Sequence, residues 1–403
     1  MISQRLNDQL TRVGPGAEAG AVLRHYWQPA CLMDELETGR AVPVNLLGER
    51  LAMVPRGDQW QLVTRRPTPE ESPMRYPDRV EVDAQGPTYP TVQRRGVVFA
   101  YLGPGEAPAL PNFDCFRAPD SHVFAFKGLW ACNWLQALEI GIDPAHASFL
   151  HRFLEDDDPE AAYGKQFRDK AAGTELPMTY ILREYPRPEI SVDETEYGLK
   201  ITALRHLDNG HTHVRVTNAI FPQAICIPMS REMTITQWHV PVDDEHCYWY
   251  TLFTSFDQPV DKAVMRAQRL AEHELPEYKP VKHRDNDYGY DPHEQATLTY
   301  TGMGLDINVH DQWAVEMMGS IQDRTREHLG RSDVAVIRNR RMLRKAIAAV
   351  ARGDSLQLPM HDGTAASLTG PLSNDAIAPT ADWQRASAQA DRERRAACPW
   401  PAV

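Results

Sequence analysis

The first third of the chain carries the pattern of a short helix followed by a small antiparallel sheet. Residues 22–27 are predicted to form a helix that leads into the turn at Pro29. Apolar and polar positions then alternate with a period of two, which is typical of half-buried strands, over residues 41–47, 50–54, 60–63, 89–92 and 96–102. The prolines from Pro67 to Pro73 cannot donate to a sheet ladder, so we expect a loop over residues 64–88.

The rest of the chain alternates between strands and two helical blocks, without a repeating strand-helix-strand rhythm. Strands spaced as in an antiparallel meander are predicted over residues 189–192, 199–207, 213–220, 233–240 and 248–253. One helical block covers about residues 133–151, and the other covers about residues 309–351. This pattern favours a mixed α+β fold.

The second helical block and the end of the chain carry clear boundary signals. The block is broken at Gly330, and Ser332 or Asp333 is expected to serve as a new N-cap. After Gly353 the composition shifts to Ser, Thr, Ala, Pro and Gly. This shift predicts a loosely packed tail with one short helix over residues 383–395.

Composition and charge exclude several classes of protein. The chain has 403 residues, 42% of them apolar, which is enough for one large or two ordinary folded domains. Its 43 basic and 55 acidic side chains give a net charge of -12, so no nucleic-acid partner is expected. Apolar stretches fall short of the ~20 residues of a membrane span, and the N-terminus is too polar for a secretory signal. With six scattered cysteines and no C-x-x-C pair, we expect a cytoplasmic protein with free thiols and no membrane partner.

The sharpest local feature is a D-x2-H-x4-H pattern formed by Asp143, His146 and His151. On one continuous helix, His146 would lie about 60° to one side of Asp143 and His151 about 80° to the other, so one face would present all three. Two imidazoles can supply nitrogen ligands to a divalent first-row metal, and the carboxylate can orient one ring. The alternative is that Asp143 and Pro144 form an ordinary N-cap pair and that the histidines are five residues apart by chance.

A metal site of this kind needs one more anionic ligand, and Asp311 is the candidate. It enters a helix that otherwise carries apolar residues such as Trp313 and Val315. The alternative role of Asp311 is that of an acid near a helix N-terminus, where the helix dipole favours negative charge. The acidic run at residues 155–158 lacks the spaced ligands of a calcium loop and is predicted to be a solvated turn. Hydrolase, kinase and dinucleotide motifs are absent from the sequence.

The segment NWLQALEIGIDPAHASFLHRF resembles the catalytic-domain signature of Rieske-type non-haem iron ring-hydroxylating oxygenases, especially the phthalate-dioxygenase-like group. Other segments resemble further parts of that family in the same order, namely LRHYWQPACLMDEL, AVPVNLLGERLAMV, GVVFAYLGPG and HDQWAVEMMGSIQDRTREHLGRSD. The resemblance covers most of residues 20–350. It implies an α+β chain with a remnant Rieske-like antiparallel β domain, a helix-grip (START-like) catalytic domain and a tail, with bounds at 1–115, 116–350 and 351–403.

The resemblance also implies roles for the motif residues. His146, His151 and Asp311 would bind mononuclear Fe(II), where O2 reacts with the substrate. Asp143 would match the family's bridging acid, which couples the iron site to the Rieske cluster of a neighbouring subunit. A trimer or a hetero-oligomer is therefore expected, because the electron path in this family crosses the subunit interface.

The sequence departs from the family at the Rieske cluster itself. A [2Fe-2S] Rieske centre needs two cysteines and two histidines, usually as C-x-H and C-x2-H. This chain has neither pair, and no cysteine occurs between residues 32 and 114, where the family places its cluster. Two hypotheses follow: electrons reach the iron from a Rieske protein or reductase on another chain, or the protein is an inactive iron-binding relative.

The substrate expected from the resemblance is an aromatic compound with a carboxylate or an aryl ether, which would be hydroxylated, demethylated or cleaved. Arg215 is the candidate to pair with a carboxylate, with Asn218 nearby, and Arg187 is a second choice. The alternative is that Arg215 is a solvated or cross-strand-paired residue. The competing function is a catalytically inactive START-like small-molecule-binding protein, whose pocket would be lined by Trp134, Trp238, Trp249, Trp313 and Phe149.

Overall fold

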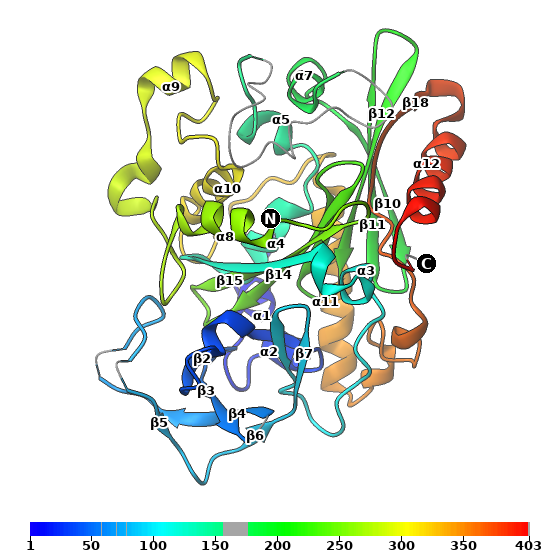
Figure 1. Cartoon of the computed structure of the whole chain (residues 1–403). Helices are drawn as coiled ribbons and strands as arrows, with labels where there is room; N and C mark the ends of the chain where they lie inside the picture. Colours follow the sequence, from blue (N-terminus) through cyan, green and yellow to red (C-terminus); the bar gives the residue numbers. More distant parts are fainter. Residues whose placement is uncertain (58, 70, 78, 156–175, 402–403) are drawn as a thin grey trace.

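The computed structural model describes residues 1–57, 59–69, 71–77, 79–155 and 176–401 (Figure 1). Within these ranges the strands form four antiparallel sheets, and helices pack around the largest of them. Of the acidic run expected to form a turn, residues 156–158 lie outside the described residues. Among the helices of the described ranges, none is both long and apolar enough to cross a membrane.

The N-terminal part of the chain contains two helices and two small sheets. The helices are α1 (Gln4–Thr11) and α2 (Glu18–Arg24). The first sheet has the order β1-β8-β7, with the strands β1 (Gln28–Leu32), β8 (Val97–Ala100) and β7 (Thr91–Arg94). The second has the order β2-β3-β4-β5, and β6 also pairs with β4; its strands are β2 (Val42–Leu46), β3 (Glu49–Arg56), β4 (Gln59–Arg66), β5 (Glu81–Val82) and β6 (Thr88–Tyr89). The alternating segments are therefore confirmed as strands, whereas the loop expected over residues 64–88 contains the two short strands β5 and β6.

An eight-stranded antiparallel sheet dominates the rest of the chain. Its order is β10-β11-β12-β13-β14-β15-β9, and β18 pairs with the first half of β12. The strands are β9 (Val123–Trp130), β10 (Glu189–Thr195), β11 (Gly198–His206), β12 (His211–Ile220), β13 (Ala224–Pro228), β14 (Met233–Pro241), β15 (Cys247–Ser255) and β18 (Asn374–Pro379). A separate hairpin pairs β16 (His273–Glu274) with β17 (Lys279–Pro280). The meander predicted from the sequence is confirmed, and β9 and β13 were missed because they are buried on both faces and show no polar alternation.

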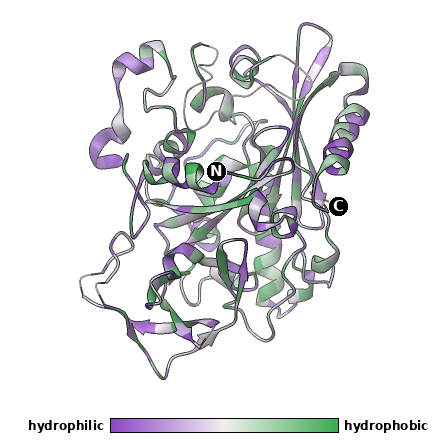
Figure 2. Ribbon diagram, viewed as in Figure 1, coloured by the Kyte–Doolittle hydropathy of each residue, from purple (hydrophilic) through white to green (hydrophobic). Residues whose placement is uncertain are grey.

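The helices that follow the N-terminal part are α3 (Asp114–Arg117), α4 (Trp134–Gly141), α5 (Ala147–Leu150), α7 (Met178–Glu184), α8 (Lys262–Leu270), α9 (Pro292–Thr297), α10 (Ile307–Glu316), α11 (Val334–Ala351) and α12 (Trp383–Ala397). Four of them form a connected group near the sheet: α4 packs on β14, α10 packs on α4 and α5, and α5 packs on α7. The peripheral helices α9 and α12 carry mostly hydrophilic residues (Figure 2).

Both predicted helical blocks are interrupted. In the first, α4 ends at Gly141, so the expectation that Asp143, His146 and His151 share one helix face is wrong. The cause is Pro144, which lacks an amide hydrogen and disfavours helical geometry at the residue before it. In the second block α10 ends at Glu316, well before the predicted break.

The expectation of a loosely packed tail is wrong for the described residues. β18 is hydrogen-bonded to β12 along its whole length, and α12 packs against β18. Trp400 is buried, and its indole N–H donates to the carbonyl oxygen of Ser255 at 3.0 Å. A composition average over fifty residues does not detect a single strand whose small buried residues, such as Ala376 and Ala378, pair with an existing sheet edge.

The largest hydrophobic cluster includes residues from the small sheets and from the large sheet. Phe99 on β8 lies 5.6 Å, centroid to centroid, from Trp238 on β14 and 5.3 Å from Phe116. The Tyr250 hydroxyl on β15 donates to the carbonyl oxygen of Ala30 on β1 at 2.9 Å. The position expected for the domain boundary, near residue 115, therefore lies inside a continuous core. The division into two domains at this position stays a prediction.

Candidate metal centre

Three side chains from two parts of the sequence meet at the group formed by α4, α5 and α10. The Nε2 atoms of His146 and His151 lie 3.6 and 3.3 Å from Oδ1 of Asp311, and 3.2 Å from each other. One ligand atom from each residue thus falls within 4.8 Å of the other two. A search of the described residues for three or more His, Cys, Asp or Glu side chains that could share a metal ion gives this group.

The sequence reaches this arrangement through a turn rather than through a helix face. The carboxylate of Asp143 accepts from the backbone amides of Ala145 at 2.8 Å and His146 at 3.1 Å, as an N-cap residue does. This turn follows α4 and leads into the single-turn helix α5, which ends at Leu150 with His151 as its C-cap. The N-cap residue of α5 is His146, so the interpretation of Asp143 and Pro144 as an N-cap and N1 pair is wrong for this helix. Asp143 instead holds the turn before α5, and this turn brings the two histidines together.

Each imidazole is oriented by a contact outside the cluster. Nδ1 of His146 donates to the backbone carbonyl of Asp143, which leaves Nε2 directed toward Asp311. The ring of His151 stacks on that of His310 at a centroid distance of 5.7 Å. His310 in turn donates from Nε2 to the carbonyl oxygen of Gly304 at 2.9 Å.

The electrostatics of the cluster favour a bound cation. Burial of Asp311 opposes its ionisation, but His151 and His146 lower its pKa below the ordinary value. Burial lowers the pKa of His146, which favours the neutral form of the imidazole that binds metals. Oδ1 of Asp311 is buried and makes no hydrogen bond, which leaves a carboxylate oxygen available as a ligand. Two imidazole nitrogens and one carboxylate oxygen are a donor set that suits a divalent first-row metal such as Fe(II).

The cluster opens into a cavity of about 110 Å³ between the helices and the large sheet. Apolar side chains from β13 and β14 line much of it, among them Ile225, Ile227 and Ile235. Polar groups also reach the cavity, including Gln237, His239, Arg205 and Arg215. An apolar chamber with a few converging polar groups is the usual form of a small-molecule site.

Arg215 reaches this cavity, but its charge is already paired. Its guanidinium contacts the carboxylate of Asp375 on β18 at 2.5 Å and donates to the carbonyl oxygen of Pro228 at 2.7 Å. Asn218 does not line the cavity, because its amide is bonded to Tyr197 and Ser373 in the interior. Arg187 is exposed and also lies outside the lining.

A second arginine, Arg205 on β11, is the cavity residue that sequence reasoning missed. It is 2% exposed and donates to the carbonyl oxygens of Tyr185 and Pro144 and to Oγ of Ser148. Its Nη1 is buried and has no hydrogen-bond partner. Burial lowers the pKa of Arg205 to about 10, so the side chain remains charged at neutral pH. The signal in the sequence was a charged residue inside the otherwise apolar run ITALRHL.

His239 on β14 was also missed. It is 1% exposed and lines the cavity, with Nε2 at 3.3 Å from Nε2 of Gln237. Burial lowers the pKa of His239 to about 3, so the ring is neutral at physiological pH. Trp238 points to the opposite face of the strand, as the alternation along β14 requires.

Comparison with known proteins gives the family. A family model described as "LigXa C-terminal domain like" matches residues 100–397. The chain belongs to this family. Its curated relatives include the phthalate 4,5-dioxygenase oxygenase subunit of Pseudomonas putida, 28% identical with 88% of each chain covered. Another is the 5,5'-dehydrodivanillate O-demethylase oxygenase subunit of a Sphingobium species, 26% identical with 90% of this chain and 84% of the relative covered.

These relatives identify a Rieske-type non-haem iron oxygenase subunit of the phthalate-dioxygenase group. The fold agrees: the oxygenase in the reduced oxygenase–ferredoxin complex of carbazole 1,9a-dioxygenase aligns with a TM-score of 0.50 at 17% identity, covering 91% of this chain and 98% of that one. The mixed α+β fold predicted from the sequence is confirmed. Oxygenases of this type use mononuclear iron, and the donor set described above fits that metal.

Proposed function

We propose that this chain is the catalytic subunit of an oxygenase that hydroxylates, demethylates or cleaves an aromatic substrate, with electrons from a Rieske protein on another chain. The observation that carries the proposal is the convergence of His146, His151 and Asp311 at the edge of a partly apolar cavity. These three side chains would hold Fe(II), and the iron would supply the activation of dioxygen. The alternative, a catalytically inactive binding protein, would follow if no Rieske protein on another chain supplied the electrons.

The chain's own residues would prepare the site for the metal. The bond from Nδ1 of His146 to the carbonyl of Asp143 fixes the proton on Nδ1 and frees Nε2 as a ligand. The carboxylate of Asp143 accepts hydrogen bonds from two backbone amides of the turn, one of them that of His146, and so fixes the position of the His146 backbone. We retain Asp143 as the candidate residue for coupling to an external electron donor, because it also lines the cavity beside the cluster.

The electron donor is assigned to another chain because of what the N-terminal sheets lack. Between residues 32 and 114 there is no cysteine, and between residues 26 and 121 there is no histidine. A Rieske cluster needs two residues of each type, so the segment between residues 32 and 114 has no ligands for one. A trimer or a mixed oligomer that includes a cluster-bearing protein would meet this need.

The proposed substrate class is an aromatic compound with a carboxylate group. A cavity of about 110 Å³ approaches the roughly 150 Å³ of an apolar cavity that admits benzene, so it suits a single ring. Arg205 brings a buried positive charge without a carboxylate bonded to it, and Nη1 lacks a partner. An anionic substrate group would supply that partner.

Reconstitution tests the proposal directly. The purified protein is loaded anaerobically with Fe(II) and offered a panel of aromatic carboxylates and aryl ethers, first with a reductase alone and then with an added Rieske protein. We expect product only when the Rieske component is present. Product formed with the reductase alone would refute the assignment of the electron donor, and a protein that binds no iron would refute the metal site.

A further inference from the structure

The proposed metal site is assembled from two helices that approach it separately. α4 leads into the turn that carries His146, whereas α10 carries Asp311. A shared metal ion requires ligand atoms from both helices to be held within about 0.5 Å of their working positions. Whatever fixes α10 against α4 therefore bears on metal binding.

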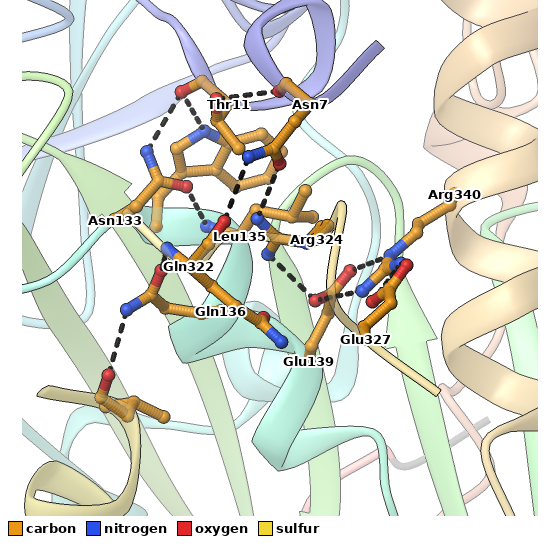
Figure 3. A network of polar contacts seen from close by, with 12 residues as sticks. Asn7, Thr11, Asn133, Leu135, Gln136, Glu139, Gln322, Arg324, Glu327 and Arg340 are labelled. Carbon is orange, nitrogen blue, oxygen red and sulfur yellow. Dashed lines mark hydrogen bonds and ion pairs between the residues drawn. The ribbon is translucent and has the colours of Figure 1, made fainter. Parts of the chain in front are cut away.

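One buried side chain joins these helices. Gln136 lies on α4, is 1% exposed, and uses its whole carboxamide (Figure 3). Its Nε2 donates to the carbonyl oxygen of Val315 at 2.9 Å and to that of Gly319 at 2.7 Å. Its Oε1 accepts from the backbone amide of Gln322 at 2.8 Å.

The bond to Val315 acts on the helix that carries the carboxylate ligand. Val315 follows Asp311 by one helical turn, so the two residues lie on the same side of α10. The last carbonyl groups of a helix have no partner within the helix, and Gln136 satisfies one of them. Its bonds to Gly319 and Gln322 fix the turn that follows α10 to the same point on α4.

We propose that Gln136 is a positioning residue for the metal site, which holds Asp311 in register with His146 and His151. The inference rests on the proposed function, because it concerns the same three ligands. Gln136 does not contact the ligands; it acts through the backbone of α10. Loss of its two donated bonds would let α10 shift relative to the turn that carries the histidines.

The rest of the network offers a matched control, because it fastens α4 to other parts of the molecule. Glu139 on α4 pairs with Arg324 and with Arg340 of α11 (Figure 3). Asn7 on α1 is 2% exposed, accepts from Arg324 at 3.1 Å and donates to the carbonyl oxygen of Gln322 at 2.9 Å. Asn7 is thus as buried as Gln136 and belongs to the same network, but neither of these bonds reaches α10.

The experiment compares Gln136→Met with Asn7→Leu in the full chain, using Co(II) as the probe. Both variants replace an amide with an apolar side chain of similar size. The readouts are the Co(II) dissociation constant, the ligand-field absorption bands of the Co(II) protein and the melting temperature of the metal-free protein. We expect Gln136→Met to weaken Co(II) binding about 10-fold and to change the bands. Asn7→Leu is expected to lower the melting temperature while the affinity and the bands stay as in the wild type.

Gln136→Glu is a second variant that keeps the proposal testable if Gln136→Met does not fold. It retains an acceptor for the amide of Gln322 but cannot donate to Val315 and Gly319, so it should weaken Co(II) binding in the same way. Unchanged affinity and unchanged bands in the folded Gln136 variants would overturn the inference. The same affinity loss in Asn7→Leu would also overturn it, because the effect would then be one of general stability. Wild-type protein that binds no Co(II) would instead overturn the metal site itself.

Discussion

Replacement of Arg205 by Met is the most direct test of how the cavity recognises its ligand. The guanidinium of Arg205 donates to Tyr185, Pro144 and Ser148, but no carboxylate is bonded to it and Nη1 is free. Methionine keeps much of the unbranched stem while removing the charge. We therefore expect the variant to lose affinity for an aromatic carboxylate much more than for an uncharged analogue.

The size of the effect follows from the pairing that is lost. A hydrogen bond to a charged group contributes about 1.5–3 kcal/mol net, which corresponds to roughly a 10- to 150-fold change in Kd. Because the pKa of Arg205 is still about 10, wild-type affinity for a carboxylate should not vary between about pH 6 and pH 8. Above a pH of about 10 the guanidinium would lose its proton and the affinity would fall.

Isothermal titration with benzoate and benzamide measures the effect, and Arg215→Met is the matched control. Arg215 is paired with Asp375, so its removal leaves a buried carboxylate and should lower stability more than benzoate affinity. The reasoning is refuted if Arg205→Met binds benzoate as tightly as the wild type does. It is equally refuted if benzamide binding falls by the same factor, because charge would then play no part.

Three further perturbations test the site and the scaffold. Asp311→Asn should abolish the binding of about one Fe(II) per chain, as measured by elemental analysis, and retained iron would contradict its role as a ligand. Glu139→Gln should lower the free energy of unfolding in urea by about 3–5 kcal/mol, because the fully buried Arg324 would lose its carboxylate partner. Glu327→Gln should lower this free energy by less, and equal losses in the two variants would contradict this account. Burial holds the pKa of His273 at about 4, so its neutral form stabilises the fold above pH 6.5 and that stability is lost as the pH falls toward 4. Between about pH 7 and pH 5 the loss is about 2 kcal/mol, and His273→Gln should show a correspondingly flatter pH profile in urea titrations.

Strands were predictable from the sequence where apolar and polar residue types alternate, as they do along β11 and β14. β13 and β18 are short and take their stability from neighbouring strands, which a local pattern does not reveal. The same reasoning explains why α4 was extended past Gly141: the apolar spacing continues, but Pro144 prevents the helix from doing so.

The candidate site was predictable from residue types and order, although not from the geometry first assumed. His146, His151 and Asp311 do converge, but through a turn in which Asp143 accepts hydrogen bonds from two backbone amides. The pocket residues were harder, because a buried charge such as Arg205 is identified by what surrounds it in three dimensions. Sequence alternation places a side chain such as Arg215 on one face of a strand. It does not show whether the neighbouring strand carries an ion-pair partner such as Asp375.

Phe99 connects the small N-terminal sheets to the wall of the metal cavity through its contact with Trp238. It covers Trp238, whose strand neighbours Gln237 and His239 form the cavity wall on the other side of β14. Residues 1–115 thus provide apolar side chains that pack against the outer face of the cavity wall, and this structural role does not depend on a redox centre. A fragment that begins near residue 116 would expose the indole ring of Trp238 to water. The intact chain should therefore unfold in a single calorimetric transition, and not in separate transitions for residues 1–115 and for the rest of the chain.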